Sequence, residues 1–520
     1  MSSSTSRKLA LISVSDKTDI DKIAKELISN NYDILSTGGT AKFLTKNKIP
    51  NIPIAKFTNF EEILEGRVKT LHPVIHAGIL AKNKNDLLKI KDSNYQLIDM
   101  VIVNLYPFEK VTADKNCKFA DAIENIDIGG PTMLRAAAKN HNRVTVLTDP
   151  DDYQTVIKEI KNKGSTTKNL RYKLALKVFS LISKYDSAIT NYLIENSKIK
   201  EDLIPTELNI VLEKENNLRY GENPHQRAAL YNIRIPKSLG FNFKQLAGKE
   251  LSFNNLVDSE SALSCVKQFQ KHACVIVKHA NPCGVSESTS LLKAYNEAYS
   301  TDPTSSFGGI IAFNKKLDHK LLKKILSQQF VEVIIAPDVT KGCLNVIKTK
   351  PNVRLIVIKD FLKNIKNVEM KSLKNKFLIQ ESDVKIISKK DLKIVTKKKP
   401  SSAQIDDLLF AFKVARYVKS NAIVFVKNKR TLGIGAGQMS RIDSTNIAHS
   451  KAKKANISLK NCVMASEAFF PFRDNVDLAK KIGVSSIIQP GGSVKDKEII
   501  SVSNKHNISM VFSGVRVFKH

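Results

Sequence analysis

The sequence predicts an α/β fold organised around parallel sheets. Short apolar runs that suit buried strands alternate along the chain with segments whose apolar residues recur at helical spacing, and this alternation builds parallel sheets. The chain has 520 residues, and at roughly 150 residues per domain about three or four structural units are expected. Hydrophobic residues make up 42% of the chain, which is enough to bury a core and argues against extended disorder.

The first 200 residues show the alternation most clearly. Residues 9–14 predict a buried strand, and the apolar positions within residues 20–28 predict a helix directly after it. The further elements expected are a strand at 32–36, a glycine loop at 37–40, a helix from Ala41 onward, and strands at 101–105 and 144–147. Together these elements predict one parallel-sheet domain.

A domain boundary is expected near residue 200, where the pattern weakens around a proline. Beyond it, a helix at 256–269 leads to a strand at 273–277, and a helix at 405–418 leads to a strand at 422–426. The repetition predicts two related α/β lobes, roughly 201–390 and 391–520. A Lys-rich stretch at 341–400 lies between their motifs and carries none of its own.

The charge is strongly positive, at +33, because 83 Lys and Arg residues face 50 Asp and Glu residues. Such an excess is compatible with binding of nucleic acid or of anionic small molecules. The basic residues are mostly lysines spread along the whole chain. This spread favours a drift in composition over a dedicated nucleic-acid-binding segment, which would concentrate its charge.

The six cysteines are irregularly spaced and include no C-x-x-C pair, so neither a disulfide framework nor a zinc signature is expected. No run approaches the roughly 18 apolar residues of a membrane span. These features predict a protein of the reducing cytoplasm with no membrane partner.

Two loops of the first domain follow strands at the edge where parallel sheets usually bind ligands. Glycine lets the backbone approach a phosphate closely, while hydroxyls and a lysine supply hydrogen-bond donors. The loop residues with these groups are Ser15, Asp16, Lys17, Thr37, Gly38, Gly39 and Thr40. An ordinary turn is the alternative for each loop.

The basic segment at residues 66–80 contains Arg67, Lys69 and Thr70 and no acid of its own, which favours contact with an anion. His72 and His76 have the spacing of metal ligands. Pro73 separates them and no carboxylate is near, so we favour a structural or substrate-contacting role and predict no metal.

A strand that ends at residues 104–108 (NLYPF) is followed by residues 124–141, in which Asp127 and a glycine pair precede a basic helix. Arg135 and Lys139 lie on that helix. These groups could converge on a ligand, but a helix cap with a solvated basic face is the alternative.

The second part of the chain presents a loop at residues 218–226 with Arg219 and Tyr220, and Arg suits a phosphate. The strand at 273–277 delivers Lys278 and His279 at its end, although a single strand-end histidine is more often structural. Later, residues 433–437 form a GxGxG loop without the spacing or the acidic partner of a dinucleotide fingerprint, which argues against an NAD site. The aromatic run at 469–474 could hold a ring or simply pack in a core.

In the first domain, SVSDKT, STGGTAK, GRVKTLHP, NLYPF and IDIGG with LRAAAKNH occur in one order. This series resembles the IMP cyclohydrolase half of the bifunctional purine-biosynthesis enzymes. The resemblance implies catalytic roles for Lys69, Tyr106, Asp127 and Lys139, with Lys139 transferring protons. The substrate contacts that it implies are Ser15, Asp16, Lys17, Thr37, Gly38, Gly39, Thr40, Arg67, Val68, Thr70 and Asn104.

The rest of the chain contains, in order, LRYGENPHQ, VKHANPCG, DPTSSFGG, KSNAIVFV, GIGAGQMSRID, EAFFPFRDNVD, QPGGS and GVRVFKH. This series resembles the AICAR (aminoimidazole carboxamide ribonucleotide) transformylase half of the same enzymes. It implies that His279 is the catalytic base, that Lys278 supports it and that Asn421 polarises the formyl group. The implied substrate contacts are Arg219, Tyr220, Gly308, Glu332, Asn421, Arg441, Phe469 and Arg516, with Asp474, Gly492 and Ser493 near the folate.

For the fold, the resemblance implies a methylglyoxal-synthase-like domain, residues 1–200, followed by two cytidine-deaminase-like lobes without zinc, residues 201–520. For the function, it implies formyl transfer from 10-formyltetrahydrofolate to AICAR and closure of the formylated product, FAICAR, to IMP. Folate is then a co-substrate and no tightly bound cofactor is expected. The resemblance also implies a homodimer whose formyl-transfer sites form across the interface, with no specific nucleic-acid partner.

Overall fold

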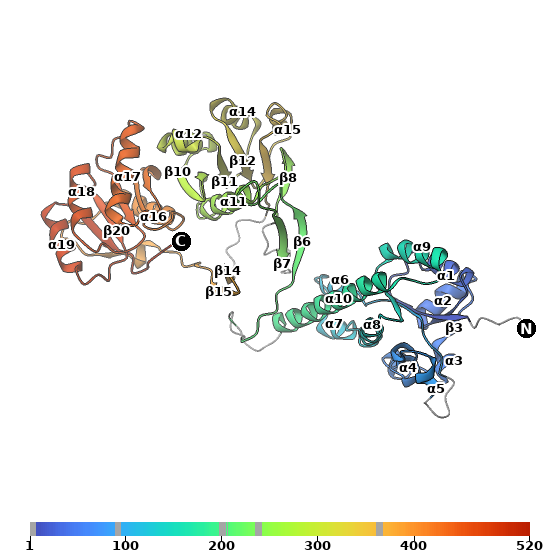
Figure 1. Cartoon of the computed structure of the whole chain (residues 1–520). Coiled ribbons are helices and arrows are strands. Elements are labelled where there is room, and N and C mark those ends of the chain that lie inside the picture. The colour runs from blue at the N-terminus through green and yellow to red at the C-terminus, as the bar shows by residue number, and fades with distance from the viewer. Residues whose placement is uncertain (1–6, 89–94, 197–203, 205, 234–241, 360–367) are drawn as a thin grey trace, which may run out of the picture. The chain divides into compact units, whose positions relative to one another are not determined.

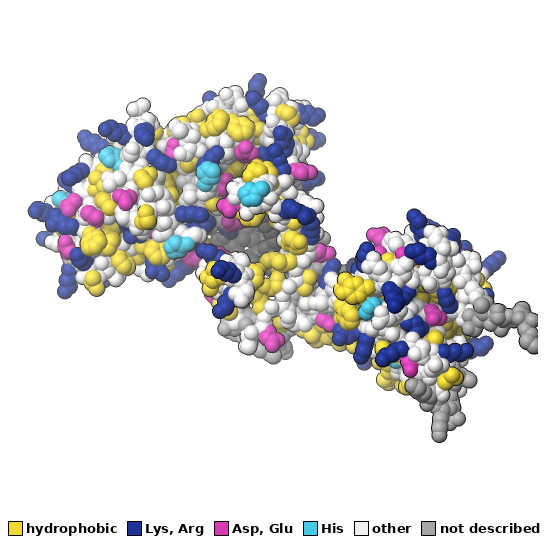
Figure 2. Space-filling view, viewed as in Figure 1, with side chains coloured by type: hydrophobic (Ala, Val, Ile, Leu, Met, Phe, Trp, Pro, Cys, Tyr) yellow, Lys and Arg dark blue, Asp and Glu magenta, His cyan; other side chains and the backbone are white. Residues whose placement is uncertain are grey.

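The computed structural model describes residues 7–88, 95–196, 204, 206–233, 242–359 and 368–520, and divides into two compact units, Met1–Val211 and Leu212–His520 (Figure 1). Each unit has its own sheet and its own buried core. On the face shown in Figure 2, Lys and Arg side chains are spread over the surface of each unit.

The N-terminal unit is built on a five-stranded, wholly parallel sheet in the order β3-β2-β1-β4-β5. Its central strand β1 is nearly all apolar, and Ala10, Leu11 and Ile12 are completely buried, as expected where helices cover both faces of a parallel sheet. The strands are β1 (Lys8–Val14), β2 (Tyr32–Ser36), β3 (Ile52–Pro53), β4 (Met100–Asn104) and β5 (Thr145–Leu147).

The helices of this unit include α1, which follows β1, and α8, which follows β4 and returns the chain to β5. Their bounds are α1 (Ile20–Ser29), α2 (Gly38–Lys46), α3 (Ile54–Thr58), α4 (Pro73–Leu80), α5 (Lys84–Leu88), α6 (Phe108–Thr112), α7 (Phe119–Glu124), α8 (Gly129–Lys139), α9 (Tyr153–Lys163) and α10 (Lys168–Glu195). Single turns of 3₁₀ helix lie at η1 (Leu64–Gly66) and η2 (Pro150–Asp152).

The glycine loop expected at residues 37–40 is in fact the start of helix α2. Thr37 is the N-cap, and the helix begins at Gly38 instead of Ala41. The two glycines therefore belong to the first turn, whose backbone N–H groups have no partner within the helix and point outward. The correction strengthens the case for an anion site, because a helix N-terminus carries partial positive charge.

The C-terminal unit is built on a single 12-stranded sheet whose order repeats outward from its centre. One half reads β10, β9, β11, β12, β13, β8, and the other reads β18, β17, β19, β20, β21, β16. The two halves meet where β10 pairs antiparallel with β18. Each half contains one of the two helix–strand pairs expected from the sequence, α11 with β9 and α16 with β17.

The strands of the first lobe are β8 (Lys244–Ala247), β9 (His272–Lys278), β10 (Asn281–Ser288), β11 (Gly309–Phe313), β12 (Val331–Ala336) and β13 (Arg354–Val357). Those of the second lobe are β16 (Lys393–Ile394), β17 (Ile423–Lys427), β18 (Arg430–Gly435), β19 (Val463–Ser466), β20 (Ser486–Gln489) and β21 (Ser509–Phe512), and η3 (Lys389–Asp391) precedes β16. Two further hairpins form separate two-stranded sheets, β6 (Leu212–Asn217) with β7 (Ala229–Ile233) and β14 (Val368–Leu373) with β15 (Lys376–Glu381).

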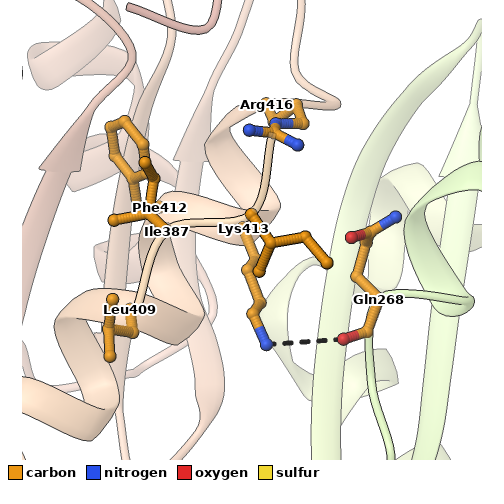
Figure 3. Close-up of a pocket in the computed structure, with 7 residues that line it drawn as sticks. Gln268, Ile387, Leu409, Phe412, Lys413 and Arg416 are labelled. Carbon is orange, nitrogen blue, oxygen red and sulfur yellow. Dashed lines mark hydrogen bonds between the residues drawn. The ribbon is translucent and has the colours of Figure 1, made fainter. Parts of the chain in front are cut away.

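The helices of this unit are α11 (Phe253–Val266), α12 (Leu291–Thr301), α13 (Pro303–Ser306), α14 (His319–Gln328), α15 (Gly342–Ile347), α16 (Ser402–Ala415), α17 (Arg441–Lys454), α18 (Asp474–Ile482) and α19 (Asp496–Lys505). Helix α16 also contacts the first lobe. Figure 3 shows its Lys413 reaching the backbone carbonyl of Gln268, with an Nζ–O distance of 3.4 Å. Phe412 on the same helix is buried in the core that the lobes share.

The GxGxG segment is not the loop that the sequence suggested, because Gly433 and Gly435 lie inside strand β18. Helix α17 crosses this strand so closely that a β-carbon on Gly435 would lie 1.9 Å from the carbonyl oxygen of Ser444. Gly433 and Gly435 therefore allow close helix–strand packing.

All six cysteines are free. Among the described residues, no helix is both long and apolar enough to cross a membrane.

Candidate active sites

Asn104, the last residue of β4, holds the loop that follows β1 at the carboxyl edge of the N-terminal sheet. Its Oδ1 accepts hydrogen bonds from the backbone N–H groups of Ser15, at 2.6 Å, and Asp16, at 3.0 Å. Lys17 turns back onto the end of β1 and donates to the carbonyls of Val14 and Ser15. Burial lowers the pKa of Lys17, and so does its proximity to Lys69. The loop after β1 is therefore locked to β4, with its lysine partly desolvated.

The second loop is tied to the same edge. The hydroxyls of Thr37 and Ser13 lie 2.8 Å apart, and the hydroxyl of Thr40 accepts from the N–H of Val14 at 3.1 Å. Lys69 also comes close, because a β-carbon on Gly38 would be 4.0 Å from its Nζ. A lysine and the N-terminus of α2 thus meet at the exposed glycines, an arrangement that suits a phosphate.

Asp127 completes this edge, just before helix α8. Its Oδ1 accepts from the N–H of Gly130 at 2.8 Å. Burial raises the pKa of Asp127, while hydrogen bonds from the backbone of Gly130 and Tyr106 and the charge of Lys69 act in the opposite direction. Lys69, Tyr106 and Asp127 therefore lie together, at the carboxyl ends of β1, β2 and β4.

Sequence reasoning missed Tyr185 on α10, which holds Asp127 in place. The Tyr185 hydroxyl accepts from the backbone N–H of Asp127 at 2.8 Å and donates to the carbonyl of Asn125 at 3.2 Å. Only its position in the apolar pattern of a long helix marks it in the sequence, and that pattern indicates burial without indicating function.

Other residues of this set have partners of their own. Arg67 pairs with Glu124 on α7, an acid that is distant in sequence. Val68 forms a β-bridge with Ile63. Thr70 is buried so closely against α8 that a β-carbon on Gly129 would lie 2.5 Å from its hydroxyl.

The two histidines of the basic segment differ in their contacts. The His72 ring accepts from the backbone N–H of Val74 at the start of α4. His76 is partly buried, its Nε2 has no hydrogen-bond partner, and burial lowers its pKa. Across the described ranges, no group of three or more His, Cys, Asp or Glu side chains could hold a metal ion.

The structure does not bring Lys139 to Asp127 within one chain. Asp127 precedes α8 at the carboxyl edge of the sheet, whereas Lys139 is the exposed last residue of that helix. Twelve residues at about 1.5 Å each separate the two positions by roughly 18 Å. Lys139 therefore lies at the opposite edge of the sheet from the other candidate residues.

In the C-terminal unit, Lys278 ends β9 and His279 starts the turn into β10. The Lys278 ammonium donates to the carbonyls of Phe307, at 2.9 Å, and Gly308, at 3.1 Å. It is thereby held against the segment that precedes β11, while His279 stays exposed.

Glu332, which follows this region on β12, is held by Arg354. The Glu332 carboxylate accepts from the Arg354 guanidinium at 2.5 Å, and the Arg354 side chain is only 5% exposed. Arg354 also donates to the carbonyls of Lys249 and Glu250. One oxygen of the Glu332 carboxylate thus already has a charged partner within the protein.

Asn281 links the two lobes at the candidate site and was not singled out in the sequence. Its Nδ2 donates to the carbonyl of His279 at 3.1 Å, and its Oδ1 accepts from the N–H of Lys419 at 2.9 Å. Lys419 lies two residues before Asn421. One side chain thus joins the His279 turn to the segment that carries Asn421.

A buried polar cluster surrounds Asn421 in the second lobe. Its Oδ1 accepts from Arg441 at 2.8 Å, and its Nδ2 donates to the carbonyl of Gln438 at 2.9 Å. Arg441 donates in turn to Glu467 at 2.7 Å and to the carbonyl of Phe469 at 3.2 Å. Glu467 is completely buried and was also missed, because an acid beside an aromatic run gives no pattern of its own.

The remaining candidates of the second lobe follow the parallel strands β19, β20 and β21. Asp474 opens helix α18, and the N–H of Gly492 donates to the carboxylate of Asp496 at 2.7 Å. The Ser493 hydroxyl accepts from the N–H of Lys495. Arg516 lies over the ring of Phe518 at 4.3 Å.

The C-terminal tail is fixed beside this cluster, because the N–H of Val517 donates to the carbonyl of Glu467 at 3.0 Å. In the first lobe, Arg219 lies over the ring of Tyr220 at 5.3 Å, and the carbonyl of Tyr220 accepts from the N–H of Phe253 at the start of α11.

Two family models match the chain. The model described as an MGS-like domain covers residues 19–132, and that of the AICARFT/IMPCHase bienzyme covers residues 137–451. The solved crystal structure of ForH is 33% identical and aligns with 36% of this chain and 98% of its own, with a TM-score of 0.32.

Curated relatives match nearly end to end. The "Bifunctional purine biosynthesis protein PurH" of Xanthomonas oryzae pv. oryzae (strain PXO99A) is 48% identical over 519 residues, which are 98% of each chain. The protein of the same name from Xanthomonas campestris pv. campestris (strain 8004) shows the same identity and coverage. The chain therefore belongs to the AICARFT/IMPCHase bienzyme family, the bifunctional AICAR formyltransferases and IMP cyclohydrolases of purine biosynthesis.

Proposed function

We propose that the C-terminal unit transfers the formyl group of 10-formyltetrahydrofolate to the 5-amino group of AICAR, and that the N-terminal unit closes the product to IMP. The observation that carries this division is that each unit gathers its own candidate residues. Lys69, Tyr106 and Asp127 meet at the N-terminal sheet edge. In the C-terminal unit, Asn281 joins the His279 turn to the segment leading to Asn421.

In formyl transfer, a bond forms between the amine nitrogen of AICAR and the formyl carbon, and the bond from that carbon to N10 of the folate breaks. The amine is conjugated with its ring and is a poor nucleophile, so its proton must leave during attack. His279 is exposed and takes this proton as the general base. Lys278, the preceding residue, is held by the carbonyls of Phe307 and Gly308 and supports this base.

The buried cluster of the second lobe positions the reacting groups. The Arg441 guanidinium meets the Asn421 amide, and both orient the formyl oxygen and the anionic substrate. Arg219 and Arg516 supply further positive charge for a phosphate or for the folate carboxylates. Phe469, which is 38% exposed, offers an aromatic face to a ring.

In ring closure, the carboxamide nitrogen attacks the formyl carbon of the same molecule and water leaves. Binding FAICAR in a folded conformation supplies proximity, so the protein mainly moves protons and stabilises an oxyanion. Lys17, Lys69 and the N-terminus of α2 hold the phosphate. Asp127, whose pKa burial raises, exchanges protons with the ring substituents.

We further assign 10-formyltetrahydrofolate as a dissociable co-substrate, a homodimer as the working assembly and the cytoplasm as its location. In this dimer, Lys139 can contribute to cyclisation. Because Lys139 lies at the far end of α8 from Asp127, it joins the reacting groups only at the cyclohydrolase site of a second chain.

The test is to incubate the purified protein with AICAR and 10-formyltetrahydrofolate and to follow tetrahydrofolate release and IMP formation together. We expect wild type to make both products, His279→Ala to release no tetrahydrofolate, and Lys139→Ala to accumulate FAICAR. His272→Ala, a change of an exposed histidine on the same strand, serves as the matched control and should keep both activities. A folded Lys139→Ala protein that loses both activities would contradict the division between the units.

A further inference from the structure

The turn that carries His279 has an unusual backbone. His279 and Ala280 both have left-handed conformations, with φ angles of 53° and 57°. Residues other than glycine rarely adopt this conformation, because it costs them about 1–2 kcal/mol each. Something outside the turn must therefore stabilise it.

Asp258 on helix α11 supplies that support. Its Oδ1 accepts from the backbone N–H of Ala280 at 2.6 Å. Burial raises the pKa of Asp258, while hydrogen bonds from the backbone N–H groups of Ala280 and His279 and the charges of His279 and Lys278 act in the opposite direction. One carboxylate thus caps the turn and lies within electrostatic range of both side chains proposed for catalysis.

The second lobe repeats this arrangement without the histidine. Asn428 and Lys429 join β17 to β18 with φ angles of 55° and 56°. Their N–H groups donate to the carboxylate of Asp407 on α16, at 2.9 and 2.7 Å.

The two aspartates hold the same place in duplicated helices. Helices α11 and α16 each have 14 residues and each begin with a serine capping box. Asp258 lies six positions after its N-cap Ser252, and Asp407 lies six positions after its N-cap Ser401. Asp407 is therefore an internal control, because it has the same structural role at a turn without a base.

We propose that Asp258 is a positioning residue for formyl transfer, which fixes the His279 turn and places a negative charge beside the imidazole that must accept a proton. The proposal rests on the role assigned above to His279. Asn428, the counterpart of His279, cannot act as a base, so the charge of Asp407 has no corresponding task.

The physical reason lies in two opposed charges around one base. The Lys278 ammonium adds a positive charge next to the His279 turn, and the Asp258 carboxylate adds an opposing negative charge. The Asp258 charge stabilises the positive charge that develops on the base as the amine loses its proton.

The experiment compares Asp258→Asn with Asp407→Asn in the full-length protein. Asparagine keeps the size of the side chain and one acceptor oxygen but removes the charge. We expect Asp258→Asn to lower kcat for formyl transfer by about 10- to 100-fold, while the KM for AICAR changes less than about twofold because no substrate contact is removed. Asp407→Asn should keep the wild-type kcat. Cyclisation of FAICAR by the same preparations reports the amount of folded N-terminal unit.

Loss of the cap weakens the turn in both variants, so urea unfolding is measured in parallel. A second variant separates strain from charge. In Asp258→Asn/Ala280→Gly, glycine relieves the left-handed strain, and we expect folding to recover while kcat stays low. If kcat returned to the wild-type value in this double variant, or if Asp258→Asn and Asp407→Asn lowered it equally, the proposed role of Asp258 would be overturned. A wild type that released no tetrahydrofolate would instead refute the proposed function itself.

Discussion

At the scale of single residues, the mechanism proposed for cyclisation depends on Asp127. We expect Asp127→Asn to lower the rate of FAICAR cyclisation by about 10²- to 10⁴-fold and to leave formyl transfer unchanged. Asparagine can still accept from the N–H of Gly130, so the start of α8 should keep its structure while the proton-exchanging group is lost. The measurement is IMP formation from supplied FAICAR.

Asp121→Asn is the matched control for this prediction, because Asp121 is an exposed acid on α7, close by in the chain. It should cyclise FAICAR at the wild-type rate. Equal losses in the two variants would show that removing any acid from this segment is harmful and would remove Asp127 from the proposed mechanism.

At the scale of elements, strand β18 and helix α17 approach each other very closely near the formyl-transfer site. A β-carbon on Gly435 would lie 1.9 Å from the Ser444 carbonyl, so Gly435→Ala must push α17 away. We expect its free energy of unfolding to fall by about 2–4 kcal/mol. The formyl-transfer rate should fall as well, because α17 begins at Arg441. Urea unfolding and tetrahydrofolate release check the two effects.

Gly437→Ala is the control for that substitution. Gly437 has a φ of 65°, but a β-carbon added there would have no atom within 4 Å, so only the strain of a left-handed residue is added, about 1 kcal/mol. If Gly437→Ala destabilised the protein as much as Gly435→Ala, the helix–strand contact would not explain the effect.

A second element-scale feature is the link between helices α18 and α19. Asp477 accepts hydrogen bonds from Arg473 at 2.8 Å and pairs with His506 at 2.6 Å, and these contacts lower its pKa to about 2 from the ordinary value of 3.8. A lowered folded-state pKa gives stability that is present above pH 3.8 and is lost as the pH falls toward 2.

We therefore expect Asp477→Asn to lower the Tm at neutral pH and to flatten the fall of Tm between about pH 4 and pH 2. Thermal unfolding at a series of pH values measures both effects. Lys481→Gln, which changes a charged residue on α18 outside this network, is the control and should keep the wild-type pH dependence. An unchanged pH dependence in Asp477→Asn would contradict the assigned link.

At the scale of the whole molecule, the proposed dimer makes cyclisation depend on two chains, because Lys139 lies at the far end of α8 from Asp127. Lys139→Ala and Asp127→Asn should each be inactive in cyclisation when pure. In a mixed dimer, one site combines Asp127 from one chain with Lys139 from the other and is intact. An equal mixture refolded together should therefore recover about a quarter of the wild-type sites.

The measurement is FAICAR cyclisation before and after the two variants are mixed and refolded. Mixing Asp127→Asn with Lys69→Ala is the control, because Lys69 and Asp127 lie at the same edge of one chain. In that mixture, the intact site would need Asp127 and Lys69 from a single chain, and every chain lacks one of them. Recovery in the control but not in the first mixture would refute the action of Lys139 across the dimer.

The sequence by itself determined the main alternation of strands and helices, although it took the start of α2 and the end of β18 for loops. Strand β2 was expected at 32–36 and lies at Tyr32–Ser36, and both lobes were recognised from repeated helix–strand pairs. The spacing of apolar residues is a local property, so it can be recognised in a short stretch of neighbouring residues. The ordered motifs likewise indicated the family to which the chain belongs.

Only the tertiary structure decided which residues meet. Glu124 pairs with Arg67 from 57 residues away, and Asn281 joins the two lobes across 138 residues. It also showed Lys139 at the far end of α8 from Asp127, the carboxylate of Asp258 at the His279 turn and the carboxylate of Glu467 beside Arg441. These pairings depend on how the strands and helices fold together. The residues on either side of a side chain in the sequence do not indicate which distant partner it will contact.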